Sequence, residues 1–245
     1  MFFNTANMLA VEVSILAALI SAVGLLSMAI LGDLGSRISP YISAFAVGVL
    51  ATATLFHLLP EGYAISDRFW DWVMLSFLGF LVMGFVFRVL ISGPSFNTDL
   101  AFASTSILAL GMHSFLDGVL YAVAFQGDAF TGWLTVLGLL VHEFPEGIII
   151  YFLLRDSRLR VVPATIIAFI AASLTTIAGT LVALSFINIA QASLSVMMGI
   201  TAGAFIYLTL FHLGPHAATS PDHRGYLAAA LGVLVSTAAI IFAVH

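Results

Sequence analysis

Two short motifs near the middle of the chain combine a histidine with a carboxylate at a spacing that suits metal binding. His113 and Asp117 are four residues apart, and so are His142 and Glu146. Side chains four apart lie on one face of a helix, so each motif presents an imidazole beside a carboxylate. Where the two faces meet, the four groups form a four-coordinate site for zinc, iron(II), manganese or cadmium. Two carboxylates also cancel the charge of a divalent ion, which makes its burial tolerable.

Two interpretations without a metal are open for the same side chains. They can pair by hydrogen bonds as isolated polar residues of a helical bundle, or they can pass protons along a relay. Two matched pairs favour the metal site over both. Glu143 is a separate case, because it lies three residues before Glu146 and points about 100° away from His142. It either binds a second ion, with Glu146 as the bridge, or accepts a hydrogen bond from a ligand histidine.

Two further pairs with the same spacing lie at the ends of long apolar stretches. His57 and Glu61 form one pair, and His212 and His216 form the other. We expect them to act as an outer and an inner mouth that attract metal from opposite sides of a membrane. Ordinary polar ends of two membrane spans account for them equally well.

The composition shows what kind of scaffold must position these side chains. Hydrophobic residues make up 62% of the 245 residues and charged residues only 8%, whereas a soluble domain is about 45–50% apolar and about 25% charged. The chain has no lysine, a net charge of −5 and no cysteine. These values exclude a soluble enzyme, a disordered chain, a nucleic-acid partner and a cysteine metal site. We therefore predict an all-α, polytopic membrane protein embedded in a lipid bilayer.

Eight apolar stretches are long enough to cross a bilayer, which takes about 20 residues each. They cover residues 8–31, 41–61, 70–92, 99–125, 131–154, 162–187, 193–213 and 225–244. The first lacks the positive start and the cleavage site of a signal peptide, so we keep it as a span. The links are short, which predicts a single transmembrane domain over residues 1–245.

The arginines predict the orientation of the spans. If the N-terminus lies outside, all of them except Arg68 fall on the cytoplasmic side, namely Arg37, Arg88, Arg155, Arg158, Arg160 and Arg224. An even number of spans then places the C-terminus outside as well. Trp70, Trp72 and Trp133 fall near the outer interface, as in an aromatic belt. The absence of trafficking signals favours the cytoplasmic (inner) membrane of a prokaryote.

Two internal repeats indicate how the spans are arranged. Thr54–Gly62 recurs as Thr209–Ala217 with six of nine positions identical, and His113–Gly118 recurs as His142–Gly147 with the pattern H-x-F-x-[D/E]-G. The copies of the first repeat are five spans apart, so they run in opposite directions across the membrane. This pattern is typical of inverted-repeat transporters and predicts an order of three, two and three spans.

These residues resemble the ZIP family of divalent-metal transporters. His142–Gly147 matches the family's fifth-helix motif HExPEG, and His113–Gly118 resembles its fourth-helix motif HNxxEG. Ala46–Glu61 and Ala202–Tyr207 resemble its second and seventh helices. The resemblance implies eight spans with both termini outside, and transport of zinc or a similar ion toward the cytoplasm. It also implies that His113, Asp117, His142 and Glu146 hold the ion, which is a substrate and not a cofactor.

The chain departs from the family pattern beside this site. The second metal of some members uses the Asn of HNxxEG, the second residue of the fifth-helix motif and an acid on helix 6. Here Ser114 replaces the Asn, and the sixth span carries no acid. Only Glu143 remains of that set, so a full binuclear centre is not expected.

Two other functions compete with metal import. An intramembrane zinc-dependent hydrolase would use H-E-x-x-H, and here the fifth position is Glu146. A zinc exporter of the cation-diffusion type has six spans and cytoplasmic termini, against the arginine pattern. The preferred metal and the oligomeric state stay open at this point, with a homodimer among the alternatives.

Overall fold

The protein is a bundle of long helices. The computed structural model describes residues 4–31, 34–66, 68–93, 98–126, 129–220 and 222–244, and every regular element among them is helical. In chain order the α-helices are α1 (Thr5–Leu31), α2 (Leu34–Ala53), α3 (Leu59–Ser66), α4 (Phe69–Ser92), α5 (Thr98–Ala124), α6 (Ala129–Asp156), α7 (Val161–Phe169), α8 (Thr175–Ser185), α9 (Ile187–Tyr207), α10 (Gly214–Ala217) and α11 (Arg224–Val244). Three π-helical turns join successive helices: η1 (Thr54–Leu58), η2 (Ile170–Leu174) and η3 (Leu208–Leu213).

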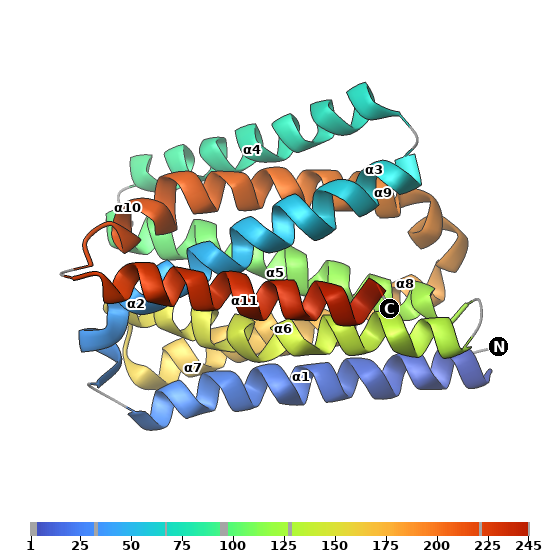
Figure 1. The fold of residues 1–245 in the computed structure, drawn as a ribbon, viewed down its shortest axis with the longest axis horizontal. Coiled ribbons are helices and arrows are strands. Elements are labelled where there is room, and N and C mark those ends of the chain that lie inside the picture. The colour runs from blue at the N-terminus through green and yellow to red at the C-terminus, as the bar shows by residue number, and fades with distance from the viewer. Residues whose placement is uncertain are drawn as a thin grey trace.

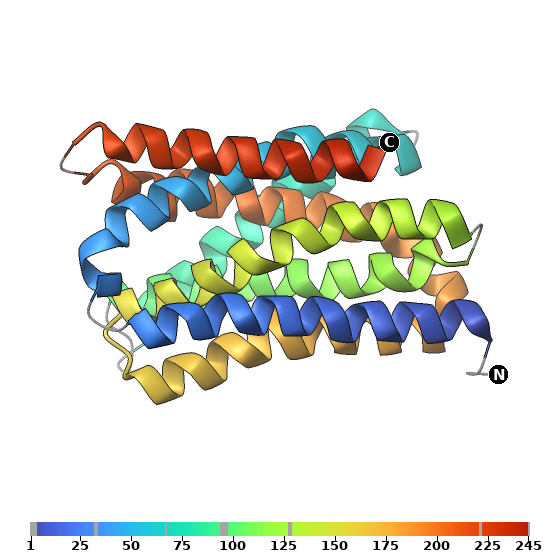
Figure 2. The ribbon, with the colours of Figure 1, turned by 60° about the horizontal axis from the view of Figure 1, so that its bottom comes forward.

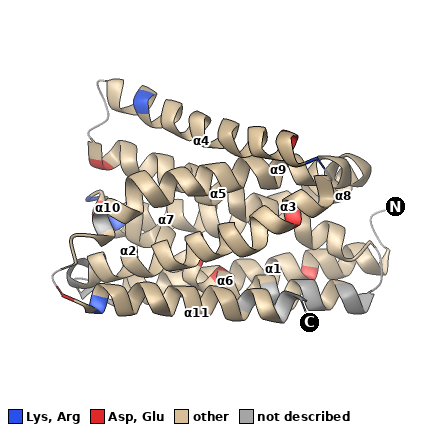
Figure 3. Ribbon diagram, turned by 45° about the horizontal axis from the view of Figure 1, so that its top comes forward, with Lys and Arg blue, Asp and Glu red and all other residues tan. Residues whose placement is uncertain are grey.

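These elements form eight rods, because each π turn continues one helix into the next. Within the described residues, six rods are long and apolar enough to cross a membrane. The all-α, polytopic prediction is therefore confirmed. α1 begins and α11 ends at the same end of the bundle (Figure 1), and Figure 2 shows the same arrangement from a second side. Most of the arginines lie at the opposite end (Figure 3).

The glycines that close the two matched motifs allow unusually close helix packing. A Cβ added to Gly118 of α5 would lie 2.0 Å from the carbonyl oxygen of Thr176 on α8, and one added to Gly147 of α6 would lie 2.1 Å from that of Ser21 on α1. Without a hydrophobic driving force between helices in lipid, such backbone contacts supply the packing energy. The motif glycines thus fix α5 against α8 and α6 against α1.

These contacts follow the inverted repeat that the sequence predicts. Equivalent glycine contacts join α2 to α11, through Gly48 and Gly232, and α4 to α9, through Gly79 and Gly203. An inverted three-two-three repeat exchanges the first three rods with the last three and α5 with α6. Under that exchange the α1–α6 contact becomes the α8–α5 contact, and the α2–α11 contact becomes the α9–α4 contact. The packing therefore repeats as well as the sequence.

Both copies of the TLFHL repeat form π turns. The backbone N–H of Leu59 donates to the carbonyl of Thr54, and that of Gly214 donates to Thr209, so each bond spans five residues. In each copy a proline, Pro60 or Pro215, stands two residues after the last residue of TLFHL. Proline lacks an N–H and its ring clashes with the carbonyl four residues earlier, and a wider turn relieves both problems.

Three details of the sequence prediction are wrong. The second span does not end at residue 61, because the π turn absorbs Pro60 and the chain stays helical to Ser66. Trp72 is not part of a lipid-facing belt, because it is 4% exposed and its indole packs on Gly62. Trp70 and Trp133 do face outward. The predicted link before residue 193 is also helical, since α9 begins at Ile187.

Candidate metal centre

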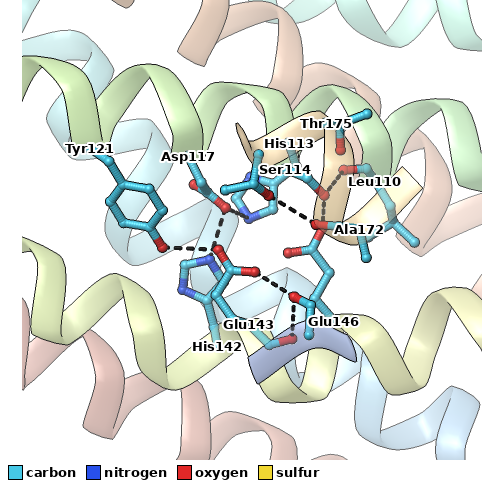
Figure 4. A network of polar contacts seen from close by, with 12 residues as sticks. Leu110, His113, Ser114, Asp117, Tyr121, His142, Glu143, Glu146, Ala172 and Thr175 are labelled. Carbon is cyan, nitrogen blue, oxygen red and sulfur yellow. Dashed lines mark hydrogen bonds and ion pairs between the residues drawn. The ribbon is translucent and has the colours of Figure 1, made fainter. Parts of the chain in front are cut away.

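Four side chains from α5 and α6 converge in the interior of the bundle. One ligand atom from each of His113, Asp117, His142 and Glu146 can be chosen so that all lie within 4.8 Å of one another. Three of these side chains are buried and His142 is partly buried. Figure 4 shows His113 and Asp117 reaching from α5 toward His142 and Glu146 of α6. The two i, i+4 pairs therefore meet face to face, as their spacing predicts.

Asp117 lies between the two imidazoles. Its Oδ2 atom is 3.4 Å from His113 Nε2 and 3.1 Å from His142 Nε2. The imidazole rings are 5.3 Å apart between centroids, and the ring of Phe205 on α9 packs on His113 at 4.7 Å. The Nε2 atoms of both histidines thus point at the same carboxylate oxygen, and an ion at that point would meet both.

Several atoms of this cluster have no hydrogen-bond partner among the described residues. They are His113 Nδ1, Asp117 Oδ1 and Glu146 Oε2. Buried polar atoms are normally satisfied by protein or by ordered water. The other oxygen of Glu146, Oε1, accepts a hydrogen bond of 2.6 Å from the Ser114 hydroxyl. Ser114 therefore orients the Glu146 carboxylate and leaves one oxygen for a further partner.

A small cavity adjoins the cluster. Its volume is about 40 Å³, and about 10–15 Å³ suffices for one water-sized particle. His113, His142 and Glu146 line it together with His57. The space beside the cluster is therefore large enough for an ion with one or two water molecules.

The predicted outer pair lies next to this cavity. His57 Nδ1 is 2.9 Å from Glu61 Oε2, and the side chains are 17% and 39% exposed. His57 thus reaches inward to the cavity while Glu61 is the more open to the surroundings. His57 belongs to η1 and Glu61 to α3, and α3 lies toward the end of the bundle where α1 begins (Figure 1).

The predicted inner pair is less open than we expected. His212 is only 3% exposed. Its ring packs among those of Phe87, Phe102 and Tyr207, and its Nδ1 is 3.3 Å from the Ser106 hydroxyl. The side chain of His216 lies outside the described residues. The structure therefore does not show an exposed mouth at His212, because aromatic side chains from α4, α5 and α9 cover it.

Glu143 points to a different set of partners. Its two carboxylate oxygens accept hydrogen bonds from Tyr121 of α5, at 2.9 Å, and from Ser21 of α1, at 2.6 Å. All three side chains are completely buried. Neither Tyr121 nor Ser21 stood out in the sequence. Tyr121 follows Asp117 by four residues and therefore lies on the same face of α5, which was the only sequence signal for its role.

Comparison with known proteins places this geometry in a family. A family model described as ZIP zinc transporter matches residues 92–242, which is more than half of the chain and includes the whole cluster. The chain belongs to the ZIP family. Among ZIP-related proteins of known name, IAA-alanine resistance protein 1 of Arabidopsis thaliana is 33% identical over 115 residues, 46% of this chain and 24% of that protein. Zinc transporter zipt-7.1 of Caenorhabditis briggsae is 29% identical over 127 residues, 51% of this chain and 32% of that protein.

The chain therefore spans less than a third of the length of either relative. The family assignment confirms the resemblance found in the motifs. It fits a multi-pass membrane protein whose ZIP motifs lie on α5 and α6, the two helices at the centre of the repeat.

Proposed function

We propose that this protein transports divalent metal cations across a membrane and that His113, Asp117, His142 and Glu146 bind the ion in transit. The observation that carries the proposal is their convergence within 4.8 Å in the interior of an apolar bundle. Ionisable groups at such depth are costly and mark ion pathways. The ZIP family match and the printed name of the Caenorhabditis relative support zinc as the substrate.

The ligand chemistry suits this cargo. Two imidazoles and two carboxylates match borderline and hard divalent ions, so zinc, iron(II), manganese and cadmium all fit the set. Two negative charges balance the ion, so the loaded site is neutral when both imidazoles are neutral. All four ligands come from one chain, so the proposed path does not require a second copy.

The proposed direction is toward the cytoplasm. It rests on the family resemblance and on an orientation with both termini outside. The arginine-rich end of the bundle supports that orientation through the preference of arginine for the cytoplasmic side (Figure 3). The relatives named above are eukaryotic, and the assignment to a prokaryotic cytoplasmic membrane stays a prediction.

Catalysis is the weaker alternative. A zinc hydrolase of the H-E-x-x-H type needs a second ligand histidine where this chain has Glu146. It also needs an activated water beside the metal. Neither the family description nor the relatives' names point to a hydrolase. We therefore propose transport without a catalytic step.

A flux assay in proteoliposomes tests this function. Zinc or cadmium entry is followed with an enclosed fluorescent indicator, for the wild type and for His113→Ala/His142→Ala. Loss of both imidazoles keeps the carboxylate charge, so we expect slower flux and a changed ratio of zinc to manganese transport. Ser14→Ala, which removes a hydroxyl that donates to the Val11 carbonyl of its own helix α1, is the matched control. Vesicles that show no protein-dependent flux of any of the four metals would refute the proposal.

A further inference from the structure

The carboxylate of Glu143 is hydrogen-bonded at both oxygens, in contrast to the other acids of the site. We propose that the centre holds a single ion and that Tyr121 and Ser21 are positioning residues that keep Glu143 from binding a second one. This inference rests on the proposed function, because it concerns the same centre.

The hydrogen bonds to Glu143 come from two different helices. Tyr121 OH of α5 donates to Oε1 at 2.9 Å, and Ser21 Oγ of α1 donates to Oε2 at 2.6 Å. All three side chains have 0% exposure, so water does not compete for these bonds. Hydrogen bonds to an ionised acceptor are short and strong. Glu143 would have to break at least one of them to approach an ion.

The carboxylates of the cluster are arranged differently. Asp117 Oδ1 and Glu146 Oε2 have no hydrogen-bond partner among the described residues. Ser114 holds only one oxygen of Glu146. Each of these two acids therefore keeps an oxygen ready for a metal, whereas Glu143 keeps none. Figure 4 shows Tyr121 approaching Glu143 from the side away from Glu146.

The surroundings of Glu143 offer few other ligands for a second ion. The rod from Val161 to Ser185 contains no acid. Its Thr175 and Thr176 hydroxyls donate to carbonyls of their own rod, Ala171 and Ala172, whereas the buried Ser173 hydroxyl has no partner among the described residues. The Ser114 hydroxyl is already engaged with Glu146. A second divalent ion beside the first would therefore lack a carboxylate from this rod to balance its charge.

Glu143 instead connects three helices. It belongs to α6, and its partners lie on α1 and α5. The two hydroxyls therefore hold the α6 turn that carries His142 in a fixed rotation against α5. Removing them should release Glu143 toward the ion, so that metal binding begins to depend on it.

A thermodynamic cycle on the purified full-length protein tests this inference. Cadmium affinity is measured by calorimetry, and bound cadmium per chain by elemental analysis after dialysis. We expect one ion per chain in the wild type, and an affinity in Glu143→Gln within about threefold of the wild type, since the coupling of noninteracting groups is small. In the Tyr121→Phe/Ser21→Ala background, Glu143→Gln should weaken binding at least about tenfold, because contacting groups couple strongly.

Controls separate a specific effect from loss of structure. Tyr151→Phe/Ser14→Ala removes a buried tyrosine hydroxyl of α6 and a serine hydroxyl of α1 outside the Glu143 contacts. In that background Glu143→Gln should again change the cadmium affinity by no more than about threefold. Tyr121→Phe and Ser21→Ala are also tested singly, so the result does not depend on the folding of the double variant.

Three results would overturn the inference. The first is two bound cadmium ions per wild-type chain. The second is a tenfold loss of cadmium affinity on Glu143→Gln in the wild-type background. The third is an equal change of cadmium affinity on Glu143→Gln in all backgrounds. Failure of the wild type to bind any metal would instead refute the proposed function, and the inference with it.

Discussion

His57 and His212 occupy the same position in two π-helical turns that run in opposite directions through the bundle (Figure 1). Their backbones match, but their surroundings differ. His57 lines the central cavity and pairs with Glu61, whereas His212 packs among aromatic rings. The repeat therefore preserves the local fold, while one half is connected to the centre and the other is closed over. Inverted-repeat transporters use this kind of asymmetry to expose a site to one side at a time.

The carboxylates of the cluster should matter most for flux. Asp117→Ala or Glu146→Ala leaves a divalent ion with uncancelled charge in a low-dielectric bundle, so zinc uptake should fall below about a tenth of the wild-type rate. Initial uptake into vesicles at matched expression measures this. Glu12→Ala, which changes an exposed acid of α1, should behave as the wild type. Near-normal uptake by Glu146→Ala would show that the ion binds elsewhere.

Metal binding should weaken as the pH falls. Ligand imidazoles and carboxylates must be deprotonated, so protons compete with the ion for the same lone pairs. The pKa of free imidazole is about 6.5, so the metal affinity should drop between about pH 7.5 and pH 5.5. Calorimetric titration with cadmium across this range measures the slope. A flat profile would mean that His113 and His142 are not ligands.

Ser114 should tune the affinity without being a ligand. Its hydroxyl holds Glu146 Oε1 at 2.6 Å, and loss of such an orienting partner typically costs about 10–100-fold in metal affinity. We expect Ser114→Ala to weaken binding by about tenfold, at the low end of that range. Thr105→Ala is the matched control, because the Thr105 hydroxyl donates to the Ala101 carbonyl of the same helix. Equal affinities in the two variants would contradict the role of Ser114.

The motif glycine of α5 should be essential for packing. Gly118→Ala places a methyl group 2.0 Å from the Thr176 carbonyl oxygen, so α5 and α8 must separate and the melting temperature should fall. Gly111→Ala on the same helix meets nothing nearer than 3.6 Å. It should keep or slightly raise stability, because alanine favours a helix over glycine by about 1 kcal/mol. Tryptophan fluorescence during heating in detergent measures both, and similar melting temperatures would refute the argument.

The orientation can be tested with single cysteines, because the chain has none of its own. Arg158 lies at the arginine-rich end, so the cysteine of Arg158→Cys should react with a membrane-impermeant thiol reagent only after the cells are opened. Arg68→Cys lies at the opposite end and should react in intact cells. The reverse pattern would mean that both termini face the cytoplasm.

The sequence predicted most of the scaffold and the core of the site. Long apolar stretches are a strong signal, and the pairs at His113 and His142 met as their i, i+4 spacing required. The π turns were not predicted, because a hydrophobic pattern does not distinguish backbone hydrogen bonds that span five residues from those that span four. The prolines after the two TLFHL copies hinted at η1 and η3, and nothing of this kind marked η2. The burial of Trp72 depends on the close approach of its indole to Gly62, which no local sequence pattern predicts.

The partners of Glu143 were the largest omission. Ser21 lies 122 residues away and Tyr121 lies 22 residues away. A serine in an apolar helix carries no signal of its own, and its contact is set by the packing of α1 on α6 through Gly147. Long-range contacts of this kind follow from the fold and not from the spacing of residues within one helix.

The position of all four proposed ligands on α5 and α6 has a mechanical consequence. An ion held by both helices acts as a cross-link between them and stabilises the state in which they are joined. Sliding α5 along α6 would pull the ligands apart and release the ion inside the bundle. If the proposed transport alternates between two open states, the ion stays bound only when α5 and α6 move together as one unit.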